Sequence, residues 1–562
     1  MSDLKRLVSK RWIIWTVGIV GGIVLLVLLA SWVLPGFFKN QLDSSLKESV
    51  REASDGLYSI DYNDLSINIL LGNAEVSDVV LRSDSTIYQK LVEQKKAPDQ
   101  VASLRTESLR LEGVSILRLL LFKSLSINEI LIESPYVTLA VDKKPYNTDR
   151  PKKSPYQIIS KVLKSIQIDR ISLTSVDFTY INNNGEKSKE NHLQELYVDV
   201  SDFLLNEETA QDTSLIMFSQ QIKIRLKGLT LDPGNDQYTF NMQELELSSR
   251  DSTIKVQNVH YKPRYGKDQF SKVLGISKDR YDFRFENITA RRVDVRRFLM
   301  QQQLFAKVLE VDKGLMDVYR DRRYPDPKES KMGTYPHQLL KQAKFVVRFD
   351  TVRIRGTEVY YGERSDKTGL RGVVKFTGTR GTITNLTNDT ATIAERPYCR
   401  VRAYSSFMGQ SRIDAYFNFN LAANNGAFNC GGTMRNFKIA HVNPVIRALA
   451  KASVESGDLN MLQFKIQANS YRSHIITQMH YNNLKVDVLK QDKESGELKE
   501  RSFLTNLLNG LFIKNNNPSG NKPPRVGEAT IDRQPTDSFF NLIWQSILGS
   551  FKGIVTGKEN DD

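Results

Sequence analysis

Side chains of the types that perform acid–base, nucleophilic or metal chemistry are present in the sequence, but their spacing does not form a recognisable site. Of the six histidines, only His474 and His480 lie close together, and their spacing along one strand makes a poor metal pair. The sequence has no Gly-x-Ser-x-Gly turn, no His-Glu-x-x-His helix, no Walker loop and no Cys-x-x-Cys pair. No pair of carboxylates has a spacing that indicates general acid–base catalysis. We therefore expect a protein that is not an enzyme and that has no cofactor and no metal.

Arginine is the other residue type whose spacing suggests chemistry. The densest basic zone contains Arg291, Arg292, Arg296, Arg297, Arg320, Arg322 and Arg323. Most runs of this kind are solvated faces, but a guanidinium group can also hold a phosphate through paired hydrogen bonds. We predict Arg291, Arg292, Arg296 and Arg297 as contacts for anionic headgroups. The net charge of +15 fits a partner of this kind, either lipid headgroups or nucleic acid.

The segment Tyr398–Met434 indicates the scaffold that would position such residues. Apolar and polar residues alternate along Tyr398–Phe407, Arg412–Leu421 and Ala427–Met434, with short turns that contain Gly or Asn between them. Because strand side chains point to opposite faces with a period of two, this meander has one apolar and one polar face. The alternation recurs in Leu484–Leu489. The residues predicted to line the apolar face are Cys399, Val401, Ala403, Ile413, Ala415, Phe417, Phe419, Leu421, Phe428, Cys430, Met434, Leu484, Val486 and Val488.

The two cysteines of the chain lie on the outer strands of this meander. By hairpin register, Cys399 and Cys430 flank the middle strand at about Phe419 and Phe417. Two strand spacings of about 4.8 Å separate their Cα atoms by about 10 Å, which is beyond the reach of a disulfide. We predict two free, buried thiols.

The first residues predict a membrane anchor. Trp12–Leu34 is a run of 23 residues without a charge, long enough to cross a hydrocarbon core of about 30 Å. The alternative is a cleaved signal peptide, but Ala30–Pro35 makes a poor cleavage site. Basic residues are denser before the run than after it, which predicts a cytoplasmic N-terminus and an exported body. No other apolar run is as long, so we expect a single-pass protein, and export argues against nucleic acid as a partner.

Strand patterns fill most of the chain after this anchor. Ser59–Leu71 and Ala74–Leu81 are predicted as strands joined by the turn dipeptide Gly72-Asn73. Leu125–Val141 is predicted to contain two more strands, with a break at Pro135.

Part of this strand pattern occurs twice along the chain. The pattern of Val114–Lys144 recurs without a gap over Val293–Arg323, and the pattern of Asp169–Tyr180 recurs over Asp350–Tyr361. Chance agreement between amphipathic strands is the alternative, but the ungapped run favours duplication of one supersecondary unit.

Helical patterns are short until the tail. We predict helices over 86–96, 116–122, 336–344 and 445–453. In the tail, the charge run Lys490–Arg501 predicts a solvated connector, and Ser502–Ile513 is apolar and helical. Asn515–Arg533 is rich in Asn, Pro and Gly, which predicts a flexible segment. Ser538–Val555 is an amphipathic helix, which would either dock on the body or contact a membrane or partner protein.

The fold class indicated by these patterns is mainly β, with short capping helices. A closed sandwich or barrel would bury the apolar face against itself. An elongated, curved antiparallel sheet would leave that face as a groove, and its burial would then require apolar ligands such as acyl chains. The small number of helices able to form a second layer favours the groove. The predicted divisions are a cytoplasmic N-terminus (1–11), an anchor (12–34), a juxtamembrane helix (35–56), two β-groove units (57–285 and 286–490) and a flexible tail with two amphipathic helices (491–562).

Several segments resemble the AsmA-like proteins of Gram-negative envelopes. The resemblance covers the N-terminal anchor, Leu65–Leu81, Leu109–Val141 and Met434–Leu489. Its most specific pieces are Asn443-Pro444-Val445-Ile446, Ser456-Gly457-Asp458-Leu459 and Tyr481-Asn482-Asn483-Leu484-Lys485-Val486. The segment Phe503–Pro518 looks like the version found in Bacteroidota. The resemblance spans most of the chain, and no catalytic residues come with it.

This resemblance implies a periplasmic protein anchored in the inner membrane, built of repeating β-grooves and related to bridge-like lipid transfer proteins. On this hypothesis phospholipid acyl chains lie on the apolar face and lipids move between the inner and outer membranes. Residues 12–34 would hold the inner membrane, and residues 538–555 would contact the outer membrane or an envelope protein. The alternative is a structural or assembly factor for outer-membrane protein or envelope biogenesis that carries no lipid. Sealing of the apolar face by helices or by a second sheet would favour that alternative.

Overall fold

The structure is a computed structural model that describes residues 47, 48, 50, 51, 54–68, 70–147, 155–160, 163–184, 188–212, 214–233, 236–491, 498–500 and 513–557. The predicted anchor Trp12–Leu34, most of the predicted juxtamembrane helix and the apolar segment 502–512 lie outside the described residues. Within the described ranges, no helix is long and apolar enough to cross a membrane. The described part of the chain is mainly β with a few short helices, as the sequence predicts.

The strands are β1 (Tyr58–Asp61), β2 (Asp64–Asn68), β3 (Asn73–Ser83), β4 (Gln100–Glu112), β5 (Ser124–Glu133), β6 (Tyr136–Val141), β7 (Ser165–Asn182), β8 (Lys189–Leu205), β9 (Ser219–Leu231), β10 (Tyr238–Ser248), β11 (Thr253–Pro263), β12 (Arg280–Val293), β13 (Gln303–Asp321), β14 (Val346–Arg364), β15 (Arg371–Thr387), β16 (Tyr398–Phe407), β17 (Ser411–Asn420), β18 (Phe428–Lys438), β19 (Ala452–Ala468), β20 (Arg472–Gln491), β21 (Leu498–Glu500) and β22 (Val526–Asp532).

The α-helices are α4 (Ser85–Glu93), α5 (Ile116–Phe122), α6 (Pro155–Ile159), α7 (Glu207–Gln211), α8 (Lys267–Leu274), α9 (Val295–Gln301), α10 (Pro336–Gln342), α11 (Thr390–Glu395), α12 (Asn443–Ala450) and α14 (Phe539–Thr556). Two short 3₁₀ helices are η1 (Pro145–Asn147) and η2 (Ile439–Val442).

The chain divides into two compact units. The first comprises the residues up to Leu229 together with Met242–Val256 and Arg292–Gln303. The second comprises Thr230–Asn241, Gln257–Arg291 and the residues from Leu304 onward.

In the first unit, strands assemble around β3 and β4. β1 and β2 pair with β3, which also pairs with β4. β5 and β6 pair with successive parts of β4 and run parallel to β7, so together they act as one strand that is interrupted at Ser134-Pro135. The interruption falls at the proline where the sequence predicts it, because proline has no backbone N–H to donate to a strand ladder. β8 pairs antiparallel with β7 and with β9.

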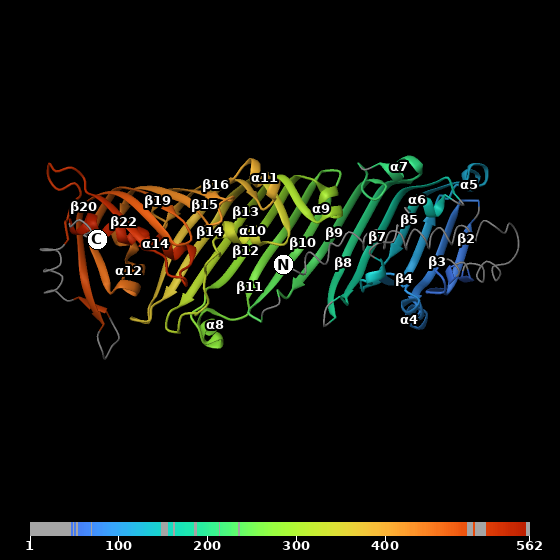
Figure 1. Ribbon diagram of the computed structural model, residues 1–562, viewed down its shortest axis with the longest axis horizontal. Coiled ribbons are helices and arrows are strands. Elements are labelled where there is room, and N and C mark those ends of the chain that lie inside the picture. The colour runs from blue at the N-terminus through green and yellow to red at the C-terminus, as the bar shows by residue number, and fades with distance from the viewer. Residues whose placement is uncertain are drawn as a thin grey trace. The chain divides into compact units, whose positions relative to one another are not determined.

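In the second unit, β14 to β20 form an antiparallel meander, and β22 pairs with β20 (Figure 1). The strands predicted within Tyr398–Met434 are present as β16, β17 and β18. Their register is the predicted one, since Cys399 lies opposite Phe419 and Cys430 lies opposite Phe417. Both cysteines are buried and free. The period-two pattern was sufficient here because the turns between these strands are short.

Single residues in the left-handed backbone region interrupt many strands. Asp78, Asp202 and Asn385 are examples, with φ of 49°, 56° and 58°. The pairing register continues unchanged across these residues. Buried residues on either side of them, such as Val76 and Val79 around Asp78, are nevertheless three apart, so the inward face moves by one residue. Ile383 and Leu386 therefore both pack against the same apolar core although they are three residues apart. These left-handed residues explain why the sequence pattern loses its period at these points.

The local geometry agrees with the predicted duplication. Helix α5 in the first copy of the pattern and α9 in the second occupy equivalent positions, and each ends on a residue in the left-handed conformation, Lys123 or Gln302. A strand begins directly after each of them. Ser134 and Lys313 are also equivalent between the two copies, and both have left-handed φ values, of 47° and 52°. The same succession of a helix, a left-handed residue, a strand segment and a second left-handed residue thus occurs twice.

The tail departs from the prediction of flexibility. Asn515–Arg533 contains β22, which pairs with β20 over seven residues from Val526 to Asp532. Asn517 is fully buried, and its side chain donates to the Met479 carbonyl at 2.6 Å and accepts from the Arg525 amide at 2.8 Å. The prediction is wrong for this segment because its amide side chains satisfy backbone groups that a flexible linker would leave to water.

Two other boundaries differ from the sequence pattern. The helix predicted over 445–453 ends at Ala450, because Lys451 adopts the left-handed conformation and β19 begins at Ala452. The predicted connector Lys490–Arg501 is partly structured, since β20 extends to Gln491 and pairs there with β21. Both departures lie where tertiary pairing overrides local composition.

Candidate functional site

The candidate site is the apolar face of the meander in the second unit. Strand register places its side chains in rows that cross the strands. One row contains Val352, Ile383, Val401, Phe417, Cys430, Ile466 and Ile475. A second contains Cys399, Phe419, Phe428 and Ala468, and a third contains Gly381, Ala403, Ala415, Gly432 and Phe464. The predicted lining residues of β16–β18 therefore share one face, as the alternation indicates.

The third row consists largely of small residues, so the apolar face is recessed there relative to the bulkier side chains beside it. Gly381, Ala403 and Ala415 are each half-buried and project little from the sheet. A Cβ atom at Gly381 would lie 2.8 Å from the Arg402 carbonyl oxygen, so this close backbone approach requires glycine. At Gly432 the ring of Phe464 occupies the space, 2.8 Å from where a Cβ would be. The open part of the row therefore runs over β15, β16 and β17, and we call Gly381, Ala403 and Ala415 the trough.

Aromatic residues close the face at one end of these strands. The ring of Phe539, the first residue of α14, lies 5.0 Å from Phe428 and 5.9 Å from Phe419 between centroids. Tyr335, which precedes α10, meets Phe428 edge-on at 5.5 Å. Leu421 is fully buried in the same core. Because tightly packed aromatic rings leave little free volume, this end of the face is sealed.

Helix α14 is seated on β20 and β22 through small and hydroxylated residues. Ser546 lies 2.7 Å from Ser473 and Ser550 lies 2.8 Å from Thr477, measured between hydroxyl oxygens. Gly527 on β22 has no room for a side chain, since a Cβ would lie 2.1 Å from the Ser550 carbonyl oxygen. The helix and the sheet therefore approach each other closely, and the contact is fully buried on the helix side.

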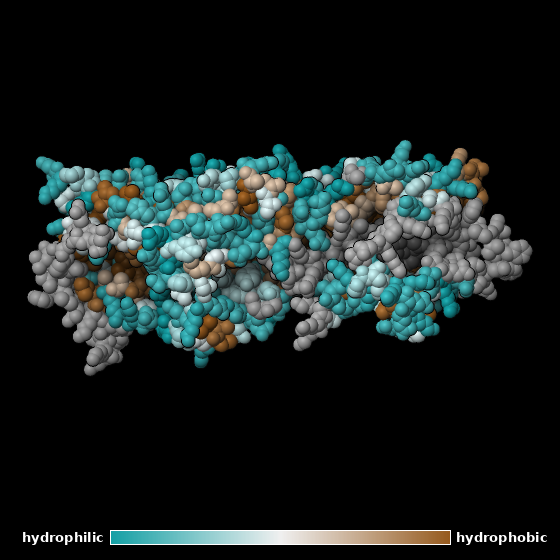
Figure 2. All heavy atoms as spheres, in the orientation of Figure 1, coloured by the Kyte–Doolittle hydropathy of each residue, from teal (hydrophilic) through white to brown (hydrophobic). Residues whose placement is uncertain are grey.

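The opposite side of α14 remains in solvent. Phe540, Trp544 and Leu548 are 66%, 46% and 47% exposed, and the spacing of four places them on one stripe. Figure 2 shows hydrophobic atoms over the region where Figure 1 places α14. Both alternatives for this helix thus have a structural counterpart, because one side docks on the body and the other presents apolar side chains.

Half-buried residues mark the less enclosed part of the face, where the ring of Phe417 still lies 6.1 Å from that of Phe539 on α14. They are Val401, Ala403, Ile413, Ala415 and Phe417. By contrast Cys399, Phe419, Phe428, Cys430 and Met434 are buried. Leu484 is buried in the same core and Val486 packs against it, whereas Val488 pairs with Ala452 near the start of β19 and lies outside that core. The predicted lining residues therefore separate into a sealed group and an accessible group.

The two thiols on this face have no reactive character. Burial raises the pKa of both Cys399 and Cys430 to about 12. At neutral pH they are therefore protonated and behave as small apolar groups.

At the sealed end of the apolar face, a histidine ring packs among apolar aromatic rings. His337 of α10 stacks on Phe419 with ring centroids 4.9 Å apart and is only 3% exposed. Burial lowers the pKa of His337 to about 4, so the imidazole is neutral at neutral pH. The ring therefore acts as part of the apolar core.

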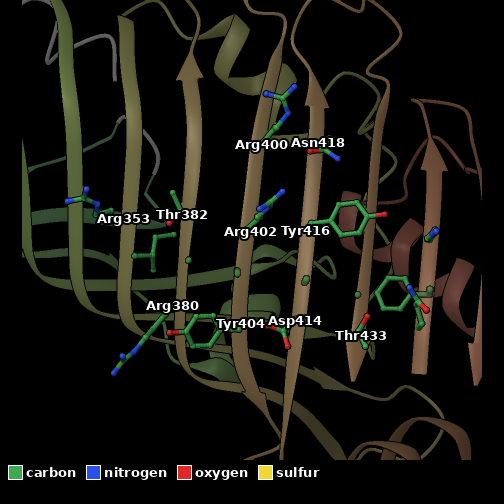
Figure 3. A pocket seen from close by; sticks show the side chains of 18 of the residues that line it. Arg353, Arg380, Thr382, Arg400, Arg402, Tyr404, Asp414, Tyr416, Asn418 and Thr433 are labelled. Carbon is green, nitrogen blue, oxygen red and sulfur yellow. The ribbon is translucent and has the colours of Figure 1, made fainter. Parts of the chain in front are cut away.

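A basic hollow of about 970 Å³ lies over the same strands, and its lining includes the trough residues Gly381, Ala403 and Ala415 beside polar-face side chains. Figure 3 shows side chains that line it, which include Arg353, Arg380, Arg400 and Arg402. The carboxylate Asp414 also lines it but is paired with Arg412 at 2.6 Å. Positive charge exceeds negative charge in this hollow, and guanidinium groups can hold phosphate or carboxylate ligands. The alternation along Tyr398–Phe407 placed Arg400 and Arg402 on the polar face, but the sequence pattern did not predict this hollow.

The arginines predicted as headgroup contacts do not form one cluster within either unit. Arg291 belongs to the second unit and donates to Glu310 at 2.7 Å, and Arg355 donates to the same carboxylate at 2.9 Å. Arg292, Arg296 and Arg297 belong to the first unit, where Arg297 pairs with Asp294 at 3.3 Å. These ion pairs reduce the charge that Arg291 and Arg297 offer to a ligand. A role for Arg292 and Arg296 stays a prediction.

Tyrosines form a second group that the sequence patterns did not identify. In the second unit, Tyr238 stacks on Tyr261 at 4.5 Å, and Tyr281, Phe283 and Phe270 of α8 adjoin this pair. Burial raises the pKa of Tyr238 to about 12. The available signal was the recurrence of aromatic residues at alternate positions of β12, beginning with Tyr281 and Phe283.

Comparisons with known proteins add no assignment to this site. No model of a known protein family matches the chain, and no curated protein matches it. Among the residues that the structure describes, no three His, Cys, Asp or Glu side chains come together to hold a metal ion. What the site can do therefore follows from its own geometry, which is that of an apolar surface open over the trough.

Proposed function

We propose that this protein binds phospholipid acyl chains on the apolar face of its sheet and supports lipid transport between the inner and outer membranes. The observation that supports this proposal is that the apolar side chains beside the trough are only partly buried. Val401, Ile413 and Phe417 remain half-buried there beside small residues. A strip of apolar surface that water can reach is costly, and an acyl chain laid along the trough would remove it from water.

The mechanism we propose is passive. Each methylene group buried on the trough contributes about 0.8 kcal/mol, so a chain segment of several methylenes would be held only moderately. The headgroup would stay in water, because removing it from water is costly. Moderate binding at each position allows a lipid to move along the face down a gradient without a chemical step.

The cellular setting follows from the resemblance to AsmA-like proteins and from the predicted anchor. We propose that residues 12–34 hold the inner membrane with the N-terminus in the cytoplasm and the body in the periplasm. The exposed stripe of Phe540, Trp544 and Leu548 on α14 would contact the outer membrane or an envelope protein.

A second candidate function is a structural or assembly role in envelope biogenesis without lipid cargo. The specific observation in its favour is the sealed end of the face, where α14 and α10 cover Phe419 and Phe428. If the trough were closed by a partner protein instead of by lipid, the same surface would serve assembly.

Co-purification of lipid from matched variants tests the proposal. Phe417→Glu places a charge on the accessible apolar face, whereas Asn418→Glu places the same charge on the polar face of the same strand. Since a membrane anchor would itself retain lipid, the informative quantity is the difference in bound phospholipid between the two full-length variants, measured by mass spectrometry. We expect Phe417→Glu to lose phospholipid relative to Asn418→Glu and the wild type. Equal lipid content in all three would contradict the carrier function and favour the assembly role.

A further inference from the structure

The largest exposed apolar side chains of the first unit gather at one tip. They come from the turn between β2 and β3 and from α5. Leu70 is 98% exposed, Leu117 is 71% exposed, and Leu71, Leu120, Leu121 and Phe122 are each more than half exposed. Figure 2 shows hydrophobic atoms at the right-hand end of the view, where Figure 1 places β2 and α5. Isolated exposed leucines are ordinary, but six large apolar side chains on two adjoining elements form a patch.

Backbone contacts hold the two elements of this tip together. The Val114 amide donates to the Gly72 carbonyl at 2.8 Å, and the Gly113 amide donates to the Asn73 side chain at 3.1 Å. Gly72 has φ of +68°, and a Cβ there would lie 2.4 Å from the Val114 carbonyl oxygen, so the approach depends on glycine. Leu119 anchors α5 as its single buried residue. The remaining apolar residues of the helix are therefore held outward by the fold.

The charges within the two segments of the tip are basic, and carboxylates flank these segments. The two segments that build it, residues 65–74 and 113–128, contain Arg118 and Lys123 and no Asp or Glu. The carboxylates that flank these segments in the sequence are Asp64, Glu75, Glu112 and Glu129. Glu112, Glu129 and Asp169 line one hollow together with Leu71, and Arg170 lies there 3.7 Å from Glu129. Within α5 and its C-cap, however, the charged residues are the cations Arg118 and Lys123, which suit contact with anionic lipid headgroups.

We infer that this tip docks into the interfacial region of a lipid bilayer. A bilayer accepts a projecting hairpin turn and a seven-residue helix without a matching pocket, whereas a protein partner would need one. Leucine and phenylalanine supply the side chains that enter the acyl boundary, and Arg118 and Lys123 can remain at headgroup level. The contact does not depend on lipid transport, and it is separate from the predicted anchor in the sequence.

Selective labelling provides the test, because both native cysteines are buried with pKa values near 12. Leu121→Cys in the full-length chain would carry an environment-sensitive fluorophore at the tip. Leu339→Cys, at an exposed leucine of α10, provides the matched control. Both proteins are reconstituted into vesicles of phosphatidylethanolamine with a minority of phosphatidylglycerol, with or without lipids brominated near the headgroup. We expect quenching at Leu121 to exceed that at Leu339 on the order of fivefold.

A second variant separates insertion from general proximity to the vesicle. Leu70→Asp with Leu117→Asp should remove the excess quenching at Leu121 while the phospholipid content of the purified protein stays unchanged. Quenching at Leu121 that equals the control, together with equal access to aqueous iodide, would overturn the inference. Protection of the Leu121 label in detergent that depends on protein concentration would also overturn it, because it would assign the tip to a second copy of the chain. Loss of trough-bound lipid in the Phe417→Glu variant alone would leave this inference intact.

Discussion

The inward apolar faces of the two units differ in both lining and exposure. In the first unit the inward residues are mainly aliphatic, with Leu109, Leu111, Ile127 and Ile132 at 1% exposure or less, and the aromatic residues Phe178 and Tyr180 are buried there as well. In the second unit the corresponding surface is aromatic at its sealed end and half-buried at the trough. The difference suggests a division of tasks, in which the aliphatic face supplies stability and the second face keeps a strip available for a ligand. The predictions below either remove this contrast or make it quantitative.

The largest expected effect is the loss of a closed aliphatic contact. Leu111→Ala should lower the free energy of opening of the first unit by about 4 kcal/mol, because a cavity in a rigid core adds to the lost transfer energy. Ile413→Ala at the half-buried face should cost the second unit about 1.5 kcal/mol, since much of that side chain is already hydrated. Hydrogen exchange measured on β4 and on β17 would compare the two. Equal losses would remove the contrast between the faces.

Lowering the pH should reduce the stability of the sealed end, because the buried imidazole of His337 disfavours the protonated form. In the unfolded chain this imidazole takes up a proton near pH 6.5, whereas in the folded protein it does so near pH 4. The stability is therefore full above pH 6.5, falls as the pH drops toward 4 and then levels off, with about 2 kcal/mol lost between pH 7 and pH 5. His337→Phe keeps the ring and should abolish this part of the pH dependence. If both proteins lost stability equally between pH 7 and pH 5, the imidazole would not be buried as described.

Displacement of α14 should open the sealed end. Gly527→Ala places a methyl group against the backbone of α14 and should destabilise its seat by about 1.5 kcal/mol. Gly266→Ala is the control, because a Cβ there meets no atom within 4 Å. Faster hydrogen exchange along Phe539–Thr556 in the first variant and not in the second would agree with the contact. Unchanged exchange in both would mean that the helix is not held at Gly527.

The smallest expected effect concerns the thiols. With pKa values near 12, about one thiol in ten thousand is ionised at pH 8, so Cys399 and Cys430 should resist alkylation in the folded protein. Denaturant should make both react at the rate of a free thiol. Mass spectrometry of the alkylated protein measures this directly, and rapid labelling without denaturant would show that the apolar face opens more than its half-buried part suggests.

The sequence predicted the meander and its register because β16–β18 keep an unbroken period of two and short turns. It did not predict what covers the meander. Ser546 and Ser550 look like polar interruptions of an amphipathic helix, and their place against Ser473 and Thr477 depends on tertiary packing. The open part of the trough was not predicted either, since Gly381 carries meaning only through its register with Ala403.

The sequence did not predict several other features, because the local residue pattern there indicated a different structure. Asn517 lies in a segment whose composition is typical of a flexible linker, but its side chain is hydrogen-bonded in the interior. Leu70 and Leu71 fitted the end of an amphipathic strand, and only the fold shows that they project with α5. Left-handed residues such as Asp202 shift the inward face without a distinctive sequence signal, because aspartate adopts this conformation at little cost.

The central claim is that lipid chains lie on one face of β17 and not on the other. Phe417 and Tyr416 are neighbours on that strand, with the first on the apolar face and the second beside the basic hollow. A benzophenone amino acid placed at either position in membranes that contain the full-length protein would crosslink to whatever lies within a few ångströms. We predict a phospholipid adduct at position 417 and little at position 416 when the crosslinked protein is analysed by mass spectrometry. Equal adducts at both positions, or none at 417, would contradict the account.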